Sequence, residues 1–291
     1  MRRQPTGTGG ACSCSHQMTR VYHFGYNSPM RPHRIFLYIC IIWCSALAFA
    51  QKPEYDFYYD FRVWARQQRQ ADRALTPDQI LERYAAKLRS EGISDTEVQR
   101  RNDLIRNSRD ALEDDFWNRF FTEGKGNYNT APNGFLMEVV ESRKPGAALD
   151  YGMGAGRNAL YLAKLGWQVS GFDPAGEAVA LAQRRAGELA LKLDAKPVRD
   201  SEYDFGKERF DLVLFSWTDP APQYVPKVVD SLRPGGIVVM ECGADWAGRN
   251  GMLKLFDALQ IVRYEIVTAK SDFFNRREME VIRLVARKPP P

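Results

Sequence analysis

The residues best suited to chemistry lie in a glycine-rich turn. Gly152, Gly154 and Gly156 alternate directly after an apolar segment, Asp150 precedes them, and Asp173 follows Gly156 by seventeen residues. Alternating glycines between a strand and a helix let backbone N–H groups and the positive end of the helix dipole approach a ligand closely. A carboxylate at the end of the next strand can accept both hydroxyls of a ribose. The spacing therefore predicts a nucleotide-like ligand.

A dinucleotide-dependent enzyme is the nearest rival interpretation. The stretch Gly154 to Ala159 satisfies the degenerate G-x-G-x-x-G/A pattern of NAD(P)-dependent oxidoreductases. However, Asp150 would repel the pyrophosphate of such a cofactor, whereas a carboxylate at that place suits a ligand with an ammonium group. The oxidoreductase therefore stays as the less favoured alternative, for which quenching of NADH fluorescence is a cheap check.

Composition excludes several catalytic devices from residues 51–291. That segment contains no histidine and a single cysteine, Cys242, so it cannot hold a Ser-His-Asp triad, a Cys-His pair or a Cys/His zinc site. We expect no bound metal. The chain has 41 basic and 36 acidic residues, but five of the basic ones lie in residues 1–50, which contain no acid. The remaining segment is thus balanced at 36 of each sign, which argues against a nucleic-acid partner.

The first fifty residues have the pattern of a leader. Arg31 and Arg34 precede an apolar run at 35–50 that ends in Ala-Phe-Ala, which predicts a secretory signal peptide over 30–50, cleaved after Ala50. Met30 is the expected true start, in place of Met1. An uncleaved membrane anchor through 35–50 is the alternative, because sixteen apolar residues are only slightly short of a full span. Either interpretation places the protein outside the cytoplasm, as a periplasmic, secreted or membrane-anchored protein. If the start of the chain is wrongly assigned and the leader is not real, the protein would be cytoplasmic.

Residues 51–125 are predicted to form a helical N-terminal arm. Thr76 followed by Pro77 opens one helix, Gly92 closes it, and Ser94 opens the next. The arm is rich in charge, so we expect it to be too polar to fold around a core of its own. Residues 126–291 are predicted to form a Rossmann-like domain.

In that domain, short apolar strands alternate with helices. This rhythm predicts an α/β fold: a doubly wound, mostly parallel seven-stranded sheet with helices on both faces. The last two strands are joined too closely for a crossover helix and should form an antiparallel hairpin. The predicted strands are 147–151, 168–172, 196–199, 210–217, 236–241, 262–270 and 278–287, and the predicted helices are 134–142, 158–165, 177–191, 222–232 and 251–259.

Over about residues 113–288, the sequence resembles class I S-adenosylmethionine-dependent methyltransferases. Within that class, 156–163 and 132–136 look like the tellurite-resistance and thiopurine-type methyltransferases, which act on small, soft acceptors. The chain departs from the usual pattern at Met153, where cysteine is common, and at 217–219, where that subgroup often carries a histidine. The matching motifs are the glycine-rich 147–158, the acidic 171–174, the fourth strand 210–215 and the turn 232–236.

The resemblance implies S-adenosylmethionine as cofactor and a role for each motif. The three glycines would cradle its methionine part, and Asp173 would hold its ribose. Asp200 would accept from the adenine amine, with Asp204 as the competing choice, and Trp217 would face the cofactor or the acceptor. Asp173 as a helix cap and Trp217 as a core residue are the alternatives that the residue types leave open.

Methyl transfer from a sulfonium is a one-step displacement that needs alignment and exclusion of water, and no histidine. If the small-molecule acceptor must lose a proton, Asp219, Tyr224 and Glu241 are the candidate bases. Export raises a conflict, because the cofactor is made in the cytoplasm. The alternative from another class is therefore a non-catalytic exported binding or scaffold protein that keeps the methyltransferase fold. The sequence does not predict an oligomeric state.

Overall fold

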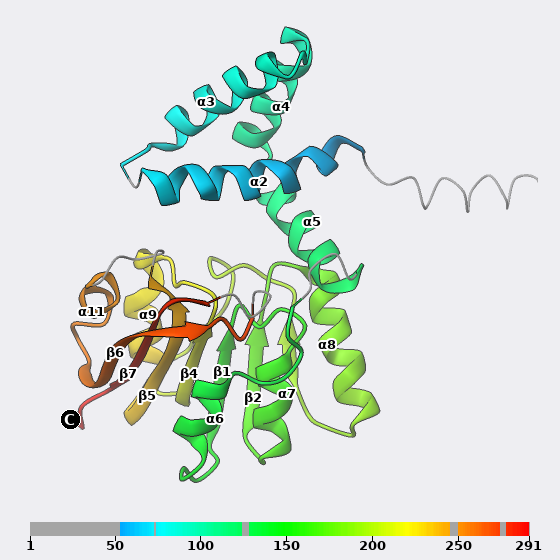
Figure 1. Cartoon of the computed structure of the whole chain (residues 1–291). Coiled ribbons are helices and arrows are strands. Elements are labelled where there is room, and N and C mark those ends of the chain that lie inside the picture. Colours follow the sequence, from blue (N-terminus) through cyan, green and yellow to red (C-terminus); the bar gives the residue numbers. More distant parts are fainter. Residues whose placement is uncertain (1–52, 73, 124–127, 245–249, 274–277, 291) are drawn as a thin grey trace, which may run out of the picture. The chain divides into compact units, whose positions relative to one another are not determined.

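The computed structural model describes residues 53–72, 74–123, 128–244, 250–273 and 278–290, which belong to one compact unit (Figure 1). The predicted leader at 1–50, with its signal segment 30–50 and its anchor alternative 35–50, lies outside these residues. Within the described ranges, no helix combines the length and the apolar character that a membrane span requires.

A seven-stranded sheet forms the centre of the fold, in the order β3-β2-β1-β4-β5-β7-β6 (Figure 1). All neighbours pair in parallel except β7, which runs antiparallel between β5 and β6. The predicted α/β class with its terminal antiparallel hairpin is confirmed. The strands are β1 (Ala147–Tyr151), β2 (Gln168–Phe172), β3 (Asp194–Lys196), β4 (Phe210–Ser216), β5 (Leu232–Gly243), β6 (Gln260–Lys270) and β7 (Glu278–Arg287).

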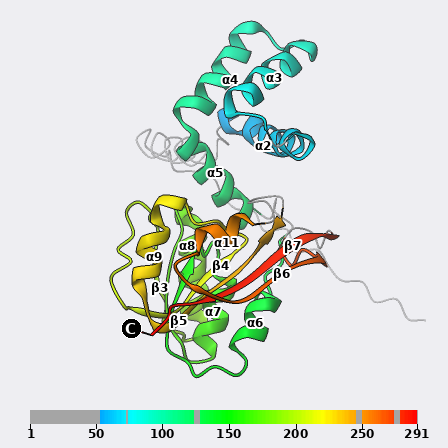
Figure 2. The same ribbon diagram turned by 90° about the vertical axis from the view of Figure 1, so that its left-hand side faces the viewer.

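Helices cover both faces of the sheet because successive strand residues point to opposite sides. In β1, Leu149 and Tyr151 join the core on one face, beneath α9 (Val225–Ser231) and α11 (Gly251–Leu255). Ala148 points to the other face and joins a second core. Figure 2 shows α9 and α6 on opposite sides of the sheet. The second core is covered by α6 (Gly134–Val140), α7 (Arg157–Lys164) and α8 (Gly176–Glu188).

Some element boundaries differ from the predicted ones. The third strand lies at 194–196 rather than 196–199, since Pro197 offers no N–H to continue the ladder. The helix predicted over 177–191 ends at Glu188, and Ala190 adopts a left-handed φ of 53°. The helix predicted over 222–232 is divided into a 3-10 turn, η1 (Pro222–Tyr224), and α9. The predicted fifth strand is the longer β5, and the helix predicted over 251–259 is the shorter α11.

The helical arm consists of α2 (Pro53–Ala71), α3 (Pro77–Ser90), α4 (Asp95–Asn107) and α5 (Arg109–Thr122). Thr76 caps α3 in a reciprocal capping box with Gln79, and Ser94 caps α4, as the residue types predict. The expectation that the arm is too polar for a core is wrong. Its few apolar residues recur at helical spacing and meet between the helices, so the core forms despite the high charge. That core includes Phe57, Tyr58, Phe61, Ile80, Leu81, Tyr84, Leu88, Val98, Ile105 and Leu112.

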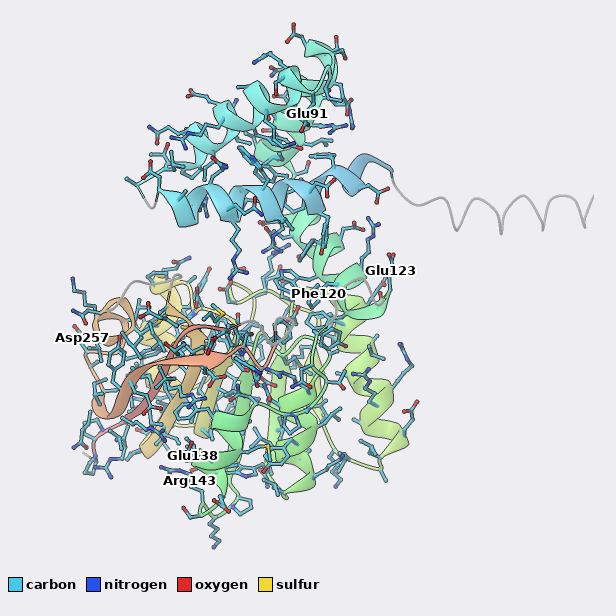
Figure 3. The ribbon with its side chains drawn as sticks, viewed as in Figure 1. Glu91, Phe120, Glu123, Glu138, Arg143 and Asp257 are labelled. Atoms are coloured by element: carbon cyan, nitrogen blue, oxygen red, sulfur yellow. The ribbon has the colours of Figure 1, made fainter. Side chains whose placement is uncertain are left out.

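The C-terminal end of α5 contacts the sheet domain. Asn118 Oδ1 accepts a hydrogen bond from the backbone N–H of Glu177, the second residue of α8, at 2.8 Å. The guanidinium of Arg199, in the loop after β3, pairs with Asp114 at 2.6 Å. Phe120, near the end of α5 (Figure 3), is 9% exposed and lies in one apolar cluster with Trp217, the residue after β4. The arm is therefore joined to the domain at the carboxyl ends of the strands.

Candidate functional site

A cavity of about 290 Å³ lies at the carboxyl ends of β1, β2 and β4. One part of its lining is the glycine-rich loop 152–155 with the carboxylates that follow the strands. Another part is aromatic, and comes from α5, from Tyr128 and from the loop between β6 and β7. Ligands of open α/β sheets bind at this edge, because the strand ends and the helix N-termini converge there.

The three glycines of the loop all adopt left-handed backbone conformations, with φ of 64° at Gly152, 51° at Gly154 and 76° at Gly156. Each is also crowded. A Cβ on Gly152 would lie 2.7 Å from Thr218 Oγ1, and one on Gly156 would lie 2.8 Å from the Ala182 side chain. Gly156 contacts α8 and does not line the cavity, whereas the other two do. Glycine is thus required at all three places, twice beside the cavity and once for packing.

Asp150 carries the most informative electrostatic feature of the cavity. Its side chain is 2% exposed, and its Oδ2 finds no hydrogen-bond partner within the described part of the chain. Burial raises the pKa of this carboxyl to about 7. A buried carboxylate oxygen without a donor is costly unless a ligand supplies one. An ammonium group in the cavity would do so, which fits the methionine part of S-adenosylmethionine.

Asp173 lines the same cavity and is 9% exposed. Its Oδ2 accepts from the Gly154 backbone N–H at 2.9 Å, and its Oδ1 accepts from the Ala175 N–H at 2.9 Å. Burial raises the pKa of the Asp173 carboxyl to about 6. Each oxygen keeps lone-pair capacity for a further donor, so this carboxylate can shape the loop and still accept ribose hydroxyls.

Asp200 and Asp204, the two adenine candidates, occupy different places. Asp200 lines the cavity, and its Oδ2 accepts a hydrogen bond of 2.7 Å from the Tyr151 hydroxyl. Asp204 is exposed, accepts from the Gly206 N–H at 3.0 Å in a turn, and does not line the cavity. The geometry favours Asp200.

The three candidate bases are likewise separated. Asp219 lines the cavity, whereas Tyr224 lies in η1 and Glu241 lies within β5, neither of them in the cavity wall. Glu241 accepts from Arg283 Nε at 2.8 Å and from Asn133 Nδ2 at 2.6 Å, and burial raises its pKa. Its two oxygens therefore serve a structural contact, and Asp219 is the candidate base that the structure brings to the site.

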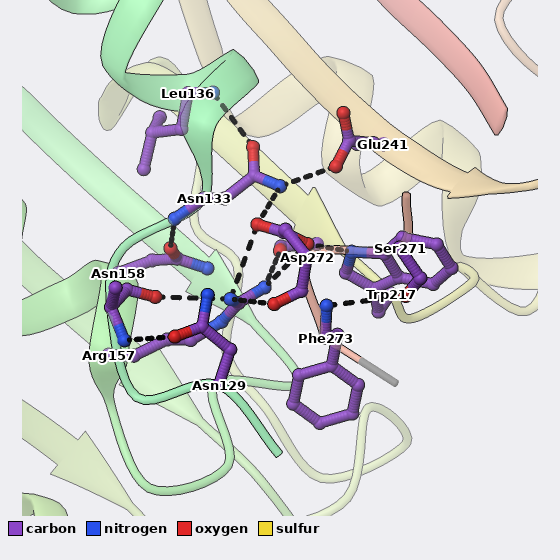
Figure 4. A network of polar contacts seen from close by, with 12 residues as sticks. Asn129, Asn133, Leu136, Arg157, Asn158, Trp217, Glu241, Ser271, Asp272 and Phe273 are labelled. Carbon is purple, nitrogen blue, oxygen red and sulfur yellow. Dashed lines mark hydrogen bonds and ion pairs between the residues drawn. The ribbon is translucent and has the colours of Figure 1, made fainter. Parts of the chain in front are cut away.

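Asp272, in the loop after β6, connects the walls of the cavity (Figure 4). Its carboxylate accepts from Trp217 Nε1 at 2.5 Å, from Asn133 Nδ2 at 2.9 Å and from Arg157 at 3.3 Å. Trp217 lines the cavity with a left-handed φ of 60°, a strained conformation for a large side chain. Asp272 thus holds Trp217 and Arg157, the first residue after the glycine loop, in fixed positions. Sequence reasoning assigned no role to Asp272 or Arg157.

Asp272→Asn should lower the free energy of unfolding by about 1 to 3 kcal/mol, because the variant loses the charge that pairs with the largely buried Arg157. Urea unfolding followed by tryptophan fluorescence measures this, and a change in the folded-state spectrum would report the Trp217 indole directly. Asp257→Asn, at an exposed carboxylate, is the control. An unchanged midpoint for Asp272→Asn would remove the positioning role.

Comparison with known proteins agrees with this geometry. Residues 148–236 match the family model described as a methyltransferase domain. Hemagglutinin 1 of Eikenella corrodens is 29% identical over 126 residues, 40% of this chain and 41% of that protein. A ubiquinone biosynthesis O-methyltransferase of Bradyrhizobium diazoefficiens is 35% identical over 102 residues, 32% of this chain and 38% of that protein. The chain thus spans about two fifths of the length of these relatives.

Among solved structures, TehB from Haemophilus influenzae superposes with a TM-score of 0.47 at 17% identity, over 59% of this chain and 67% of that one. The strand order and the glycine loop define a Rossmann-like methyltransferase fold. Residues 148–236 carry a methyltransferase domain, of the class I S-adenosylmethionine-dependent kind that the motifs resemble.

Proposed function

We propose that the protein transfers a methyl group from S-adenosylmethionine to a small-molecule acceptor by direct displacement. The observation that carries this proposal is the buried carboxylate of Asp150, a residue of the cavity lining whose Oδ2 has no donor within the described part of the chain. A scaffold with no ligand would gain stability from an amide or an apolar residue at this position. The unsatisfied carboxylate is useful when a cationic ligand binds there.

The cavity offers a partner for each part of that cofactor. Asp150 would accept from the ammonium, and Asp173 from the ribose hydroxyls. Gly152 and Gly154, with their left-handed backbone conformations, leave two places in this wall of the cavity without a side chain. Asp200 would accept from the adenine amine. When bound, the cofactor supplies a methyl group activated by the sulfonium.

The protein itself aligns the methyl donor with the acceptor, excludes water from the site and removes one proton from the acceptor. The aromatic part of the lining excludes water from the reacting atoms. Asp219, at the cavity wall after β4, is the proposed general base for an acceptor that enters protonated. An acceptor that enters already ionised needs no base.

Asp173→Ala should weaken the binding of S-adenosylhomocysteine by about 1 to 3 kcal/mol, because two charge-assisted hydrogen bonds to the ribose are lost. Isothermal titration calorimetry measures the affinity. Asp204→Ala, which removes an exposed carboxylate of the competing candidate, should leave the affinity unchanged. Equal affinities of wild type and Asp173→Ala would refute the ribose assignment.

A further inference from the structure

Seven aromatic residues line the cavity, two of them on the strands β1 and β2. The other five form what we call the aromatic wall: Trp117, Phe121, Tyr128, Trp217 and Phe273. Four of these rings, all except Trp217, form a connected series of contacts. Trp117 stacks on Phe121 with ring centroids 5.9 Å apart, Phe121 meets Tyr128 edge-on at 5.0 Å, and Tyr128 lies 5.9 Å from Phe273. This part of the cavity is a continuous aromatic surface suited to a flat ring.

Two members of the wall belong to the helical arm. Trp117 and Phe121 lie one turn apart on α5, so both face the cavity. The Phe121 ring sits where a side chain on Gly154 would be, and therefore lies directly on the glycine loop. The contacts of Asn118 with Glu177 and of Asp114 with Arg199 hold this end of α5 against the sheet domain. The arm thus completes the site.

The charge of the lining disfavours an anionic acceptor. Asp150, Asp173, Asp200 and Asp219 contribute four carboxylates, against the guanidinium groups of Arg157 and Arg199. Both guanidinium groups are already paired with carboxylates that are not part of the lining, Arg157 with Asp272 at 3.3 Å and Arg199 with Asp114 at 2.6 Å. An entering anion would meet carboxylates and find its possible counter-charges occupied.

We propose that the acceptor is an uncharged planar aromatic molecule bearing a hydroxyl or thiol, held against the aromatic wall that α5 completes. This inference rests on the proposed methyl transfer. A lone pair of the acceptor oxygen or sulfur forms the new bond to the methyl carbon. The electron pair of the broken carbon–sulfur bond returns to the sulfonium, which leaves as a neutral thioether. The acceptor proton passes to the Asp219 carboxylate.

The charge preference can be tested on the unaltered full chain supplied with S-adenosylmethionine. The acceptors are 4-methylphenol and phenol, the matched anion 4-hydroxybenzenesulfonate, and selenite. Mass spectrometry of the methylated products gives kcat/KM for each. We expect the uncharged rings to exceed both anions by about tenfold or more. A preference for the sulfonate or for selenite would overturn the inference.

The role of α5 is tested by Trp117→Ala and Trp117→Phe. We expect Trp117→Ala to raise KM for the uncharged aromatic acceptor by about tenfold, with recovery in Trp117→Phe, since a ring is restored. Trp64→Ala is the matched control, because this tryptophan packs against Tyr84 in the core of the arm and does not line the cavity. Equal KM values for Trp117→Ala and Trp64→Ala would contradict the assignment.

The same experiments separate the two levels of the proposal. If S-adenosylhomocysteine binds but the uncharged aromatic acceptors are not methylated, the acceptor inference is wrong and the cofactor site stands. If S-adenosylhomocysteine gives no binding heat, both are wrong.

Discussion

Asp150→Asn should abolish cofactor binding and at the same time stabilise the unliganded protein. The loss of affinity is expected to be about 2 to 5 kcal/mol, because the variant leaves the ligand's ammonium in a buried site without its counter-charge. The gain in stability arises because asparagine is uncharged and removes the cost of a buried carboxylate. Weaker ligand binding together with higher stability of the unliganded protein would indicate that Asp150 serves ligand binding and not folding.

The gain in stability depends on pH in a defined direction. The pKa of Asp150 is raised from 3.8 to about 7 in the folded protein, so the folded state holds a proton that the unfolded chain releases between these values. The stability due to this group is therefore complete below about pH 4 and is lost as the pH rises through about 7, at a cost on the order of 4 kcal/mol. Asp150→Asn has no titrating group at this position, so the difference in stability between this variant and the wild type should be largest above pH 7.

Thermal melts of the unliganded wild type and Asp150→Asn at about pH 5 and about pH 8 measure this effect. Asp230→Asn, at an exposed carboxylate, is the control and should not alter the pH dependence. For the wild type, the affinity for S-adenosylhomocysteine should also fall below about pH 7, because Asp150 must lose its proton to pair with the ammonium. A variant that is less stable than the wild type at high pH, or that still binds with full affinity, would contradict the role of Asp150.

Gly154→Ala is the second large effect, expected to lower the free energy of unfolding by about 2 to 4 kcal/mol. Alanine at the left-handed φ of 51° costs about 1 to 2 kcal/mol, and its Cβ would also overlap the Phe121 ring. In the double variant Gly154→Ala/Phe121→Ala, the part of the lost stability that is due to this overlap should be recovered. Urea unfolding of the wild type, the two single variants and the double variant gives the coupling energy.

Gly166→Ala is a matched control for the backbone term. Gly166 has a similar left-handed φ of 88°, but a Cβ there would meet nothing within 4 Å. Gly166→Ala should therefore lower the free energy of unfolding only by the cost of placing alanine in the left-handed conformation. If Gly154→Ala is no more damaging than Gly166→Ala, or if removal of the Phe121 ring gives no recovery, the contact between α5 and the glycine loop is wrong.

The parts of the site that could be predicted from sequence are those with local signals. Strands β1 and β2 are apolar runs that end at a glycine turn and at an acidic residue, and parallel strands bring their carboxyl ends to one edge. Asp150, Asp173 and the glycines therefore meet as expected. The third strand begins two residues earlier and ends three residues earlier than predicted, because it is only three residues long and a proline follows it.

The parts that could not be predicted depend on long-range packing. Asp272 has the local sequence of any solvated loop acid, and its contacts exist only because β6 and β7 pair beside β5 and return the loop to the cavity. In the sequence, Trp117 and Phe121 cannot be told apart from ordinary aromatic residues of a charged helix, because no local signal shows that α5 contacts the glycine loop. The arm's own core was missed for the same reason, as its residues come from four helices.

Calorimetric titration of the protein with S-adenosylmethionine and, separately, with NADH at about pH 8 tests the central claim most directly. The predicted result is saturable binding of one S-adenosylmethionine per chain, lost in Asp150→Asn, and no binding of NADH. Binding of NADH, or no heat from S-adenosylmethionine at high protein concentration, would contradict the assignment of this cavity to the methyl donor.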